Sequence, residues 1–442
     1  MTYTLLISFD LVRPGEISTP LAIASILAHQ RSEEPWRESM DVTHHSINML
    51  ECGGSARPEQ FEAVLSAYDL ERFDAIALAA YVWNEYLLNP FIALLRRMGF
   101  LGKIVLGGYQ ITYGRETELL HRYPDCQVFI FGQAEQAFAE LPDHLGADHP
   151  VFLNVPVDFE QLASPYLTGA LPVPLGAGMV RMETKRGCPY RCSFCAHRDL
   201  ITRRVNKHPL EKVFQELAYL AERRVQRVNI LDPIFNAGKE HLEVMREAKS
   251  LGIRTTFTLQ TRFENIRGGQ GVAFLDLCEQ GNFHLEFGLQ TTDHEVSKLI
   301  DRANRMDLVD TAIEQLVSRG IPYEVSLIYG LPGQTLDSFQ RSIDHLLAKG
   351  CTDVKAWPLM LLPGTKIYDQ KDQWGMREDA LGEFRIPVVT ESNTFTHYEW
   401  EAMDQMAKNL LPTDRLSHVP RTNSQGTLAN QHPLPLTLTH AA

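Results

Sequence analysis

The sequence has little that would send the protein into a membrane, a secretory pathway or a nucleic-acid complex. Its 442 residues contain no apolar run close to the roughly 20 residues that cross a bilayer. The N-terminus, "MTYTLLISFDLVRPGE", has no basic segment before its apolar stretch, unlike a signal peptide. Lys and Arg form no long run, and the net charge of -13 repels phosphate backbones. We therefore expect a cytoplasmic protein without a membrane or nucleic-acid partner.

Cysteine is also scarce, with seven residues in the chain, yet three of them fall within eight positions. An odd number in a reducing compartment argues against a disulfide framework. Cys188, Cys192 and Cys195 form a C-x3-C-x2-C pattern in "CPYRCSFC". The remaining four are scattered and are typical of buried small apolar residues. They are Cys52, Cys126, Cys278 and Cys351.

The close spacing of the three cysteines indicates a metal centre. Thiolate sulfur binds iron or zinc strongly. Three cysteines on one loop can hold three irons of a cubane cluster and leave the fourth iron open to an outside molecule. A zinc site with His197 as the fourth ligand is the alternative, although zinc sites usually use two ligand pairs a dozen or more residues apart. The spacing therefore favours a [4Fe-4S] cluster.

Alternating strand and helix patterns predict an α/β fold with two main units. Residues 1–145 contain buried apolar strands such as "FDAIALAAYVW" between amphipathic helices, which indicates a doubly wound parallel sheet of the Rossmann or flavodoxin type. Residues 146–178 are rich in Pro and Gly and suit an extended linker. Six further strand–helix units in residues 179–370 match a partial TIM-like (β/α)6 barrel.

The last part of the chain, residues 371–442, is predicted to be a small helical extension followed by a tail. Thr396 with Glu399 three positions later forms a capping box, so a helix is expected to begin there. The polar, Pro-containing residues after Pro412 are expected to drape over the surface or to move.

Several stretches resemble the radical S-adenosylmethionine (SAM) superfamily. "CPYRCSFC" is similar to that family's signature, and "RVNILDPIFN", "EFGLQTTDHEVSKLIDRANR", "YGLPGQT" and "LPGTKIY" resemble later segments in the same order, over about residues 176 to 410. The first unit, with "IVLGGYQITYGRETELL" and "VFIFGQAEQAFAEL", resembles the cobalamin-binding domain that precedes many of these barrels. Here Ala79 stands where that branch usually has Ser.

This resemblance implies three cofactors and a reaction. Cys188, Cys192 and Cys195 would hold the cluster, and its free iron would chelate SAM. One electron, from a flavodoxin- or reductase-type donor, would cleave SAM to a 5′-deoxyadenosyl radical that takes hydrogen from an unactivated C–H bond of a small molecule. Cobalamin would bind the first domain around Gly107 and Gly108.

The resemblance also suggests roles for single residues. Phe194 would shield the cluster, Gln290 would point toward SAM, and Arg302 would pair with the SAM carboxylate. Three glycines would let the backbone approach adenosine closely: Gly330, Gly333 and Gly364. Four basic residues near the cysteines could offset thiolate charge: Lys185, Arg186, Arg191 and Arg198.

Polar residues near predicted strand ends are the candidate catalytic or substrate-contacting groups, because active sites of barrels form at such ends. The catalytic candidates are Asp232, Glu286 and Glu324. Others in this set are Gln260, Arg262 and Lys355. A structural ion pair is the alternative for each.

Three functions stay open from the sequence. The first is a radical SAM enzyme of natural-product tailoring that uses cobalamin for C-methylation. The second is a cobalamin-independent radical dehydratase or deoxygenase of an aminoglycoside-like diol, with a first domain that has kept its fold and lost its ligand. The third is a zinc-stabilised binding protein without catalysis.

Overall fold

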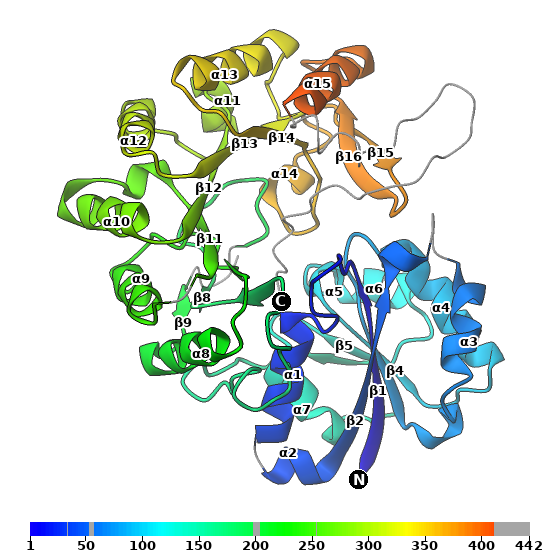
Figure 1. Cartoon of the computed structure of the whole chain (residues 1–442). Coiled ribbons are helices and arrows are strands. Elements are labelled where there is room, and N and C mark those ends of the chain that lie inside the picture. The colour runs from blue at the N-terminus through cyan, green and yellow to red at the C-terminus, as the bar shows by residue number, and fades with distance from the viewer. Residues whose placement is uncertain (33, 53–56, 198–203, 253, 411–442) are drawn as a thin grey trace.

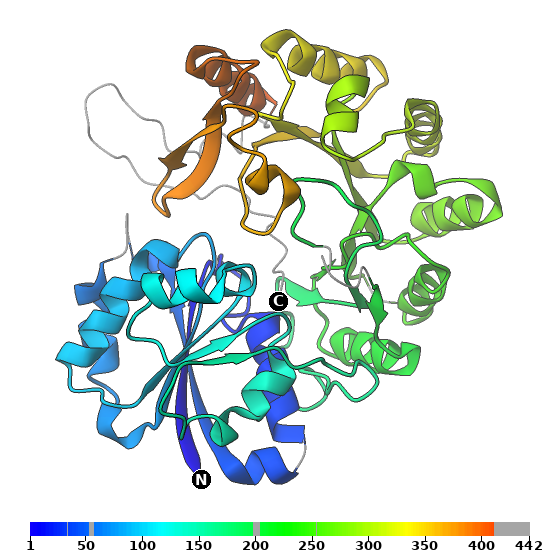
Figure 2. The same cartoon turned by 180° about the vertical axis from the view of Figure 1, so that it is seen from behind.

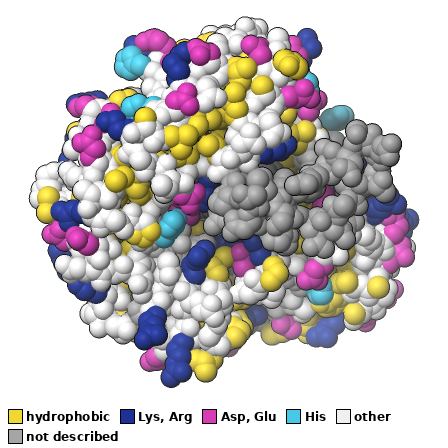
Figure 3. Space-filling model, turned by 45° about the horizontal axis from the view of Figure 1, so that its top comes forward, with side chains coloured by type: hydrophobic (Ala, Val, Ile, Leu, Met, Phe, Trp, Pro, Cys, Tyr) yellow, Lys and Arg dark blue, Asp and Glu magenta, His cyan; other side chains and the backbone are white. Residues whose placement is uncertain are grey.

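Two six-stranded parallel sheets lie side by side in the computed structural model (Figures 1 and 2). The structure describes residues 1–32, 34–52, 57–197, 204–252 and 254–410. Arg198 lies outside these described residues, and so does the predicted tail after Pro412. Within the described residues, every helix is too short or too polar to span a bilayer. Figure 3 shows acidic and basic side chains interspersed over the described part of one face.

The first sheet has the strand order β2-β1-β3-β4-β5-β6, and all neighbours are parallel. Its strands are β1 (Thr2–Asp10), β2 (Met40–Asn48), β3 (Ala75–Ala79), β4 (Lys103–Gly107), β5 (Val128–Ile130) and β6 (Val151–Leu153). Its helices are α1 (Leu21–Ser32), α2 (Glu34–Ser39), α3 (Glu62–Leu65), α4 (Glu85–Arg97), α5 (Tyr109–Thr112), α6 (Glu116–Arg122) and α7 (Glu135–Ala139). This order is that of a doubly wound fold.

Helices cover both faces of the first sheet, so its strands are buried on both sides. In β1, Leu5 and Ile7 pack with the core under α4, whereas Leu6 packs with a second core under α1 and α7 (Figure 1). Successive residues of a strand point to opposite faces. A continuous apolar run is therefore what this sheet requires.

The first sheet extends further along the chain than residue 145. The segment predicted as a linker begins with β6, which pairs with β5. The rest of that segment is irregular but well packed, because Phe159, Leu162 and Tyr166 are all buried. The division of the chain at 145 and 178 remains a prediction, and the linker is packed against the domains it joins.

The second sheet has the order β14-β13-β12-β11-β10-β7, so its strands are adjacent in chain order. They are β7 (Val180–Met182), β10 (Arg227–Ile230), β11 (Thr256–Thr261), β12 (Phe283–Gln290), β13 (Tyr323–Tyr329) and β14 (Val354–Pro358). The helices that follow are α8 (Leu210–Glu222), α9 (His241–Ser250), α10 (Gly268–Gln280), α11 (His294–Leu299), α12 (Met306–Arg319) and α13 (Leu336–Ala348). They lie along the outside of the curved sheet (Figure 1), which confirms the partial (β/α)6 barrel.

Strand β12, "FHLEFGLQ", shows how the sequence curls this sheet around a lumen. Its residues alternate between buried and partly exposed. Phe283, Leu285 and Phe287 belong to the hydrophobic core under the helices. Glu286 and Gln290 are on the other face, which is the concave side. One face is thus free to carry polar chemistry.

The C-terminal part adds more than the predicted helix. Helix α15 (His397–Asn409) begins at the Thr396–Glu399 capping box, as expected, with the Glu399 amide donating to the Thr396 hydroxyl at 3.3 Å. Before it come α14 (Lys366–Asp369) and an antiparallel hairpin of β15 (Arg377–Leu381) and β16 (Ile386–Glu391), which the sequence analysis did not foresee. A second small pair joins β8 (Lys185–Arg186) to β9 (Asn206–Lys207).

The two domains are tied together beside the cysteine loop. The Arg186 guanidinium bonds Glu183 of its own segment and Glu135 of α7, each at 2.7 Å. The Tyr109 hydroxyl donates to the Pro363 carbonyl at 2.7 Å. At Gly364, with φ of +78°, a Cβ would run into the Tyr113 ring, so glycine permits this contact. The domain interface is therefore specific.

Candidate active site

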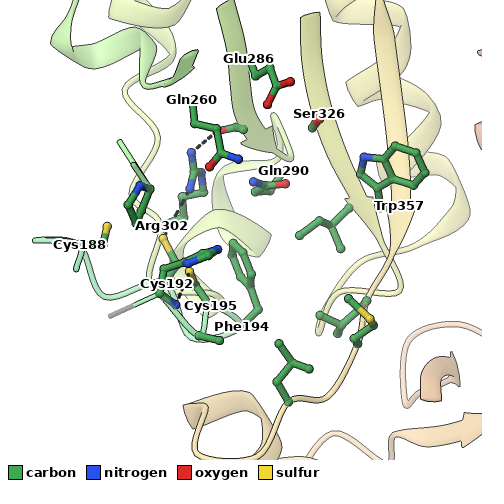
Figure 4. Close-up of a pocket in the computed structure, with 18 of the residues that line it drawn as sticks. Cys188, Cys192, Phe194, Cys195, Gln260, Glu286, Gln290, Arg302, Ser326 and Trp357 are labelled. Carbon is green, nitrogen blue, oxygen red and sulfur yellow. Dashed lines mark hydrogen bonds between the residues drawn. The ribbon is translucent and has the colours of Figure 1, made fainter. Parts of the chain in front are cut away.

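A cavity of about 350 Å³ opens between the two domains and continues into the barrel (Figure 4). The three cysteines lie at one end of it, and Glu286 lies at the other (Figure 4). Tyr81, Trp83 and Tyr109 contribute to its wall from the first domain. One continuous space thus connects the cysteines, the barrel lumen and the first domain.

The loop that carries the cysteines leaves the barrel directly after β8. Cys188 and Cys192 are buried, Cys195 is partly buried, and all three thiols are free. The loop is fixed by backbone bonds, from the Ser193 amide to the Ile300 carbonyl at 2.9 Å and from the Ile367 amide to the Ser193 carbonyl at 3.1 Å. The cysteines are consequently held by two later units of the barrel.

The environment of the thiols resists a free negative charge. Burial raises the pKa of Cys188, and burial together with the neighbouring thiols raises the pKa of Cys195 to about 12. Only the thiolate is a metal ligand, so a bound metal would release protons here. Arg302 supplies compensation, since its Nη1 lies 3.5 Å from the Cys192 sulfur.

The spacing of the sulfurs does not suit a single zinc ion. Tetrahedral zinc with Zn–S bonds near 2.3 Å brings its sulfurs to about 3.8 Å from one another. Among the described residues, the group whose possible ligand atoms all lie within 4.8 Å is His284, Glu324 and Asp353, and the three cysteines do not form such a group. A single zinc ion would therefore require the three sulfurs to move closer together.

Two of the predicted SAM contacts meet beside the cysteines. Gln290 ends β12 in a left-handed conformation, with φ of +73°, where a bulge shifts the register against β13. Arg302 donates to the Gly288 carbonyl, and a Cβ at position 288 would collide with the Gln290 amide. A strained residue held this way is typical of a functional site. Phe194 lines the same end of the cavity.

Arg262 is a second guanidinium at the cysteine end. It is 4% exposed, stacks over the Tyr190 ring at 3.9 Å and pairs with Glu264 at 2.9 Å. Its Nη1 is buried without a hydrogen-bond partner. Together with Arg302 it works against the rise in the Cys188 pKa. Within the described part of the chain, these two arginines lower the Cys188 pKa although neither is next to the cysteines in sequence.

The basic residues predicted to offset the thiolates are mostly engaged elsewhere. The Lys185 ammonium donates to the Phe235 and Ala237 carbonyls, both at 2.8 Å. Arg186 is in the domain contact with Glu135 and Glu183. Arg191 is exposed. Lys185 and Arg186 belong to β8, and their hydrogen bonds lie outside the cysteine loop.

Glu286, Glu324 and Lys355 form a polar floor inside the barrel. Glu286 pairs with Glu324 in register across β12 and β13. Burial, followed by the Glu324 charge, raises the pKa of Glu286 to about 7. Burial alone would also raise the pKa of Glu324, but bonds from His284 and Lys355 hold it below its usual value. Glu324 and Lys355 each occupy the second position of their strand, not the carboxyl end that we expected.

Asp232 is completely buried and is absent from the residues that line the cavity. Its carboxylate accepts hydrogen bonds from the Thr184 amide at 2.7 Å and the Lys185 amide at 3.1 Å, and it also bonds the Thr184 hydroxyl. This geometry gives Asp232 a positioning role in the segment before Cys188, and it conflicts with the predicted contact to substrate.

The predicted glycines divide between two places. Gly107 and Gly108 line a smaller slot of about 50 Å³ beneath α1 and α7 in the first domain. Gly330, Gly333 and Gly364 are not among the residues of the main cavity. A Cβ on Gly330 would press on β16 and one on Gly333 would meet Leu299. These glycines allow close packing of the chain with itself.

The sequence analysis overlooked several lining residues. Ser326 and Trp357 follow Glu324 and Lys355 by two positions on β13 and β14, so period-two counting from the acidic and basic residues would have found them. Tyr81 and Trp83 stack with ring centroids 4.5 Å apart at the end of β3. No local signal marked these two as facing the barrel.

A partial barrel with a cysteine loop and an adjoining doubly wound domain defines a class of two-domain iron–sulfur proteins. The profile of the radical SAM superfamily matches residues 182–346. Residues 182–346 therefore form a radical SAM domain, and the chain as a whole resembles the branch of that superfamily with a cobalamin-binding-like domain before the barrel.

Curated relatives and solved structures agree with this assignment. The chain is 26% identical over 374 residues to a 2-(S-pantetheinyl)-carbapenam-3-carboxylate methyltransferase of Streptantibioticus cattleyicolor, covering 74% of this chain and 55% of the relative. It is 25% identical over 371 residues to the cobalamin-dependent radical SAM methyltransferase TokK of Streptomyces tokunonensis, covering 72% and 54%. The chain thus spans about half the length of these relatives.

The fold resembles that of the radical SAM methyltransferase TsrM from Kitasatospora setae, solved with cobalamin and a [4Fe-4S] cluster bound. The TM-score is 0.68 at 15% identity, over 99% of this chain and 93% of that one. The cobalamin-dependent enzyme OxsB, solved with aqua-cobalamin and SAM, gives a TM-score of 0.65 at 14% identity, over 92% and 66%. Both comparisons support the two-domain architecture.

Proposed function

We propose that the chain is a cobalamin-dependent radical SAM methyltransferase that acts on a small molecule. One observation carries the proposal: the three cysteines, Gln290 and Arg302, and the aromatic edge of the first domain all border one cavity. The relatives named as radical SAM methyltransferases support this choice of reaction.

The cysteine loop fits a [4Fe-4S] cluster with one open iron. Three free thiols converge on one end of the cavity, and Arg302 and Arg262 offset their charge. We infer that Cys188, Cys192 and Cys195 are its ligands. Reduction by a flavodoxin- or reductase-type donor stays our prediction.

Gln290 and Arg302 are suited to orient SAM beside the cluster. Arg302 is held by the Gly288 carbonyl, so its fork is fixed before a ligand enters. A fixed guanidinium is a good partner for a carboxylate. The Phe194 ring lines the same end and would keep water from it.

In the first domain, the slot beneath α1 and α7 is where we expect cobalamin to bind. The slot beneath α1 and α7 is lined by small residues, among them Gly107, Gly108 and Gly132. Glu135 borders it, 1% exposed, with its Oε2 buried and without a hydrogen-bond partner. Tyr81 lines both this slot and the main cavity. We infer that cobalamin spans the two spaces.

The three cofactors would supply the difficult chemistry: electron transfer, radical generation and methyl delivery. The residues of this chain bind and orient them and exclude water. The barrel would present the reacting carbon of the substrate between Gln290 and the Tyr81–Trp83 pair.

Anaerobic reconstitution tests this proposal directly. The chain is loaded with iron, sulfide and hydroxocobalamin, desalted, and examined by iron analysis and visible absorption. We expect about four irons per chain and a retained corrin band. Material without iron would refute the cluster, and material with iron but no corrin band would refute cobalamin dependence.

A matched pair of variants sharpens the cobalamin test. Gly132 and Gly99 both have positive φ, at 68° and 93°, and both have room for a Cβ, but only Gly132 lines the slot. Gly132→Val should lose the corrin band, whereas Gly99→Val should keep it. Equal retention by both variants would contradict binding in the slot.

A radical dehydratase or deoxygenase acting on a diol is the second candidate, and Glu286 is the observation that favours it. A carboxyl with a pKa of about 7 can hold a proton at neutral pH and give it to a leaving hydroxyl. An iron-loaded protein without a corrin band would select this candidate.

A further inference from the structure

The end of the cavity remote from the cysteines is built from three neighbouring strands. Glu286 comes from β12 and Glu324 and Ser326 from β13, while Lys355 of β14 bonds Glu324 without lining the cavity itself. Figure 4 shows Glu286 and Ser326 directed into the cavity at this end. Strands give side chains a fixed direction, so this floor is a rigid surface.

The charges of the floor are unequally paired. The Lys355 ammonium bonds Glu324 and lies 3.9 Å from Asp353, and the His284 ring is 3.4 Å from Glu324. Both basic groups therefore interact with the Glu324 carboxylate. Glu286 lines the cavity, and its carboxylate has no hydrogen-bond or ion-pair partner among the described residues.

A carboxylate in this position lacks a partner that the protein itself could provide. Taking a charged group out of water costs free energy unless another charge or donor replaces the water. The raised pKa of Glu286 expresses this cost. A ligand with a positive charge and N–H donors would supply what the protein does not.

A metal ion and an anionic ligand fit the floor less well. The possible ligands His284, Glu324 and Asp353 lie within 4.8 Å of one another, but the Lys355 ammonium already bonds that group. An incoming carboxylate would find Lys355 paired with Glu324 and would face Glu286 as a like charge. An organic ammonium group avoids both conflicts.

The wall between the floor and the cysteines is largely apolar. Ile328, Trp357, Leu359 and Met360 line this cavity. Such a wall suits the carbon skeleton of a small molecule, and an indole face also favours cations. A ligand with an ammonium at one end and a hydrocarbon or ring body would meet complementary groups along its length.

We propose that the floor binds the ammonium group of the substrate, with Glu286 as its carboxylate partner and Ser326 beside it. The substrate class is therefore small primary or secondary amines whose reacting carbon lies toward Gln290. This inference rests on the proposed function, because it assigns the substrate of the same cavity.

A pair of probes that differ in one group tests the proposal: 2-phenylethylamine and 2-phenylethanol, each titrated at pH 8 into the full chain by saturation-transfer NMR. The amine should bind about tenfold more tightly, the worth of one charge-assisted hydrogen bond. Glu286→Gln should remove the preference. Glu314→Gln, which removes an exposed carboxylate on α12, should keep it.

Three outcomes would overturn the proposal: no binding of the amine, equal binding of the alcohol, or an unchanged preference in Glu286→Gln. The same titration on Cys192→Ala separates this inference from the proposed function. That variant lacks a cluster ligand but has an intact floor, so its preference for the amine should persist even where iron and SAM cleavage are lost.

Discussion

The two parallel sheets of this chain have the same number of strands but opposite relations to solvent. The first, ordered β2-β1-β3-β4-β5-β6, has helices on both faces, and the second, ordered along the chain from β7 to β14, has helices outside only. Strand β1 is therefore buried on both faces, whereas β12 alternates between buried and partly exposed residues. The difference shows that strand order decides which sheet encloses a lumen, and the lumen carries the polar side chains.

The largest expected effect is the loss of a cysteine at the mouth of the lumen. Cys192→Ala should abolish cluster assembly and SAM cleavage, because two thiolates cannot hold the cubane with one open iron. Cys278→Ala is the matched control, since Cys278 is as deeply buried but belongs to α10 on the outer side. Iron content and 5′-deoxyadenosine formation are the measurements, and iron retained by Cys192→Ala would contradict the cluster assignment.

Alanine substitutions at two adjacent residues of β12 should have different effects on the free energy of unfolding. Phe287 is 1% exposed and stacks on Phe263 with ring centroids 3.9 Å apart, so Phe287→Ala should cost about 3–5 kcal/mol of unfolding free energy. Glu286 faces the lumen, so Glu286→Ala should cause no comparable loss at pH 4, where its carboxyl is protonated. Denaturant titration measures both, and similar losses would mean that β12 lacks the predicted inward and outward faces.

In the first sheet, alanine substitutions at adjacent residues of β1 should lower the free energy of unfolding by similar amounts. Leu5 is 0% and Leu6 3% exposed, and they pack in two different cores on opposite faces of β1. Leu5→Ala and Leu6→Ala should each cost about 2–4 kcal/mol. A large loss for only one of them, measured by the same titration, would remove the contrast with β12.

The smallest effect is a pH-dependent gain in stability. The folded pKa of Glu286, about 7, lies above the unfolded value near 4.3, so the folded state holds this proton more tightly. Stability therefore falls as pH rises through that window. The groups that act on Glu286 are Glu324, His284, Lys355 and Arg227.

Glu286→Gln removes this dependence and should stabilise the ligand-free protein by about 1–2 kcal/mol at pH 8, allowing for partial exposure, with no gain at pH 4. Thermal unfolding of the variant and of Glu314→Gln at both pH values provides the measurement. A gain that is equal at the two pH values would exclude titration of Glu286 as its source.

The fold followed from sequence because its signals are local. The apolar runs of β1 and β3, the alternation in β12 and the Thr396 capping box each specify their own element. The cysteine spacing is also a local signal, and the three cysteines it singled out lie together at one end of the cavity. The hairpin of β15 and β16 was missed, since its strands are short and the first is exposed.

The site was only partly predictable because its pairings are long-range. The sequence around Arg262 does not indicate that its side chain stacks on Tyr190. The sequence around Arg186 likewise does not indicate its ion pair with Glu135 in the other domain. Asp232 follows a strand like a catalytic residue, yet it is buried against the Thr184 segment. Only the three-dimensional packing distinguishes residues that position the cysteine segment, such as Asp232, from residues that line the cavity.

The contact of Arg186 has a consequence for any attempt to divide the protein. Its two carboxylate partners, Glu135 and Glu183, originate from different sheets, and Glu135 is 1% exposed. Separating the halves would leave Arg186, two residues before Cys188, with Glu183 alone and would remove the counter-ion of Glu135. The metal loop is therefore assembled by both halves jointly, and neither half is a self-sufficient module.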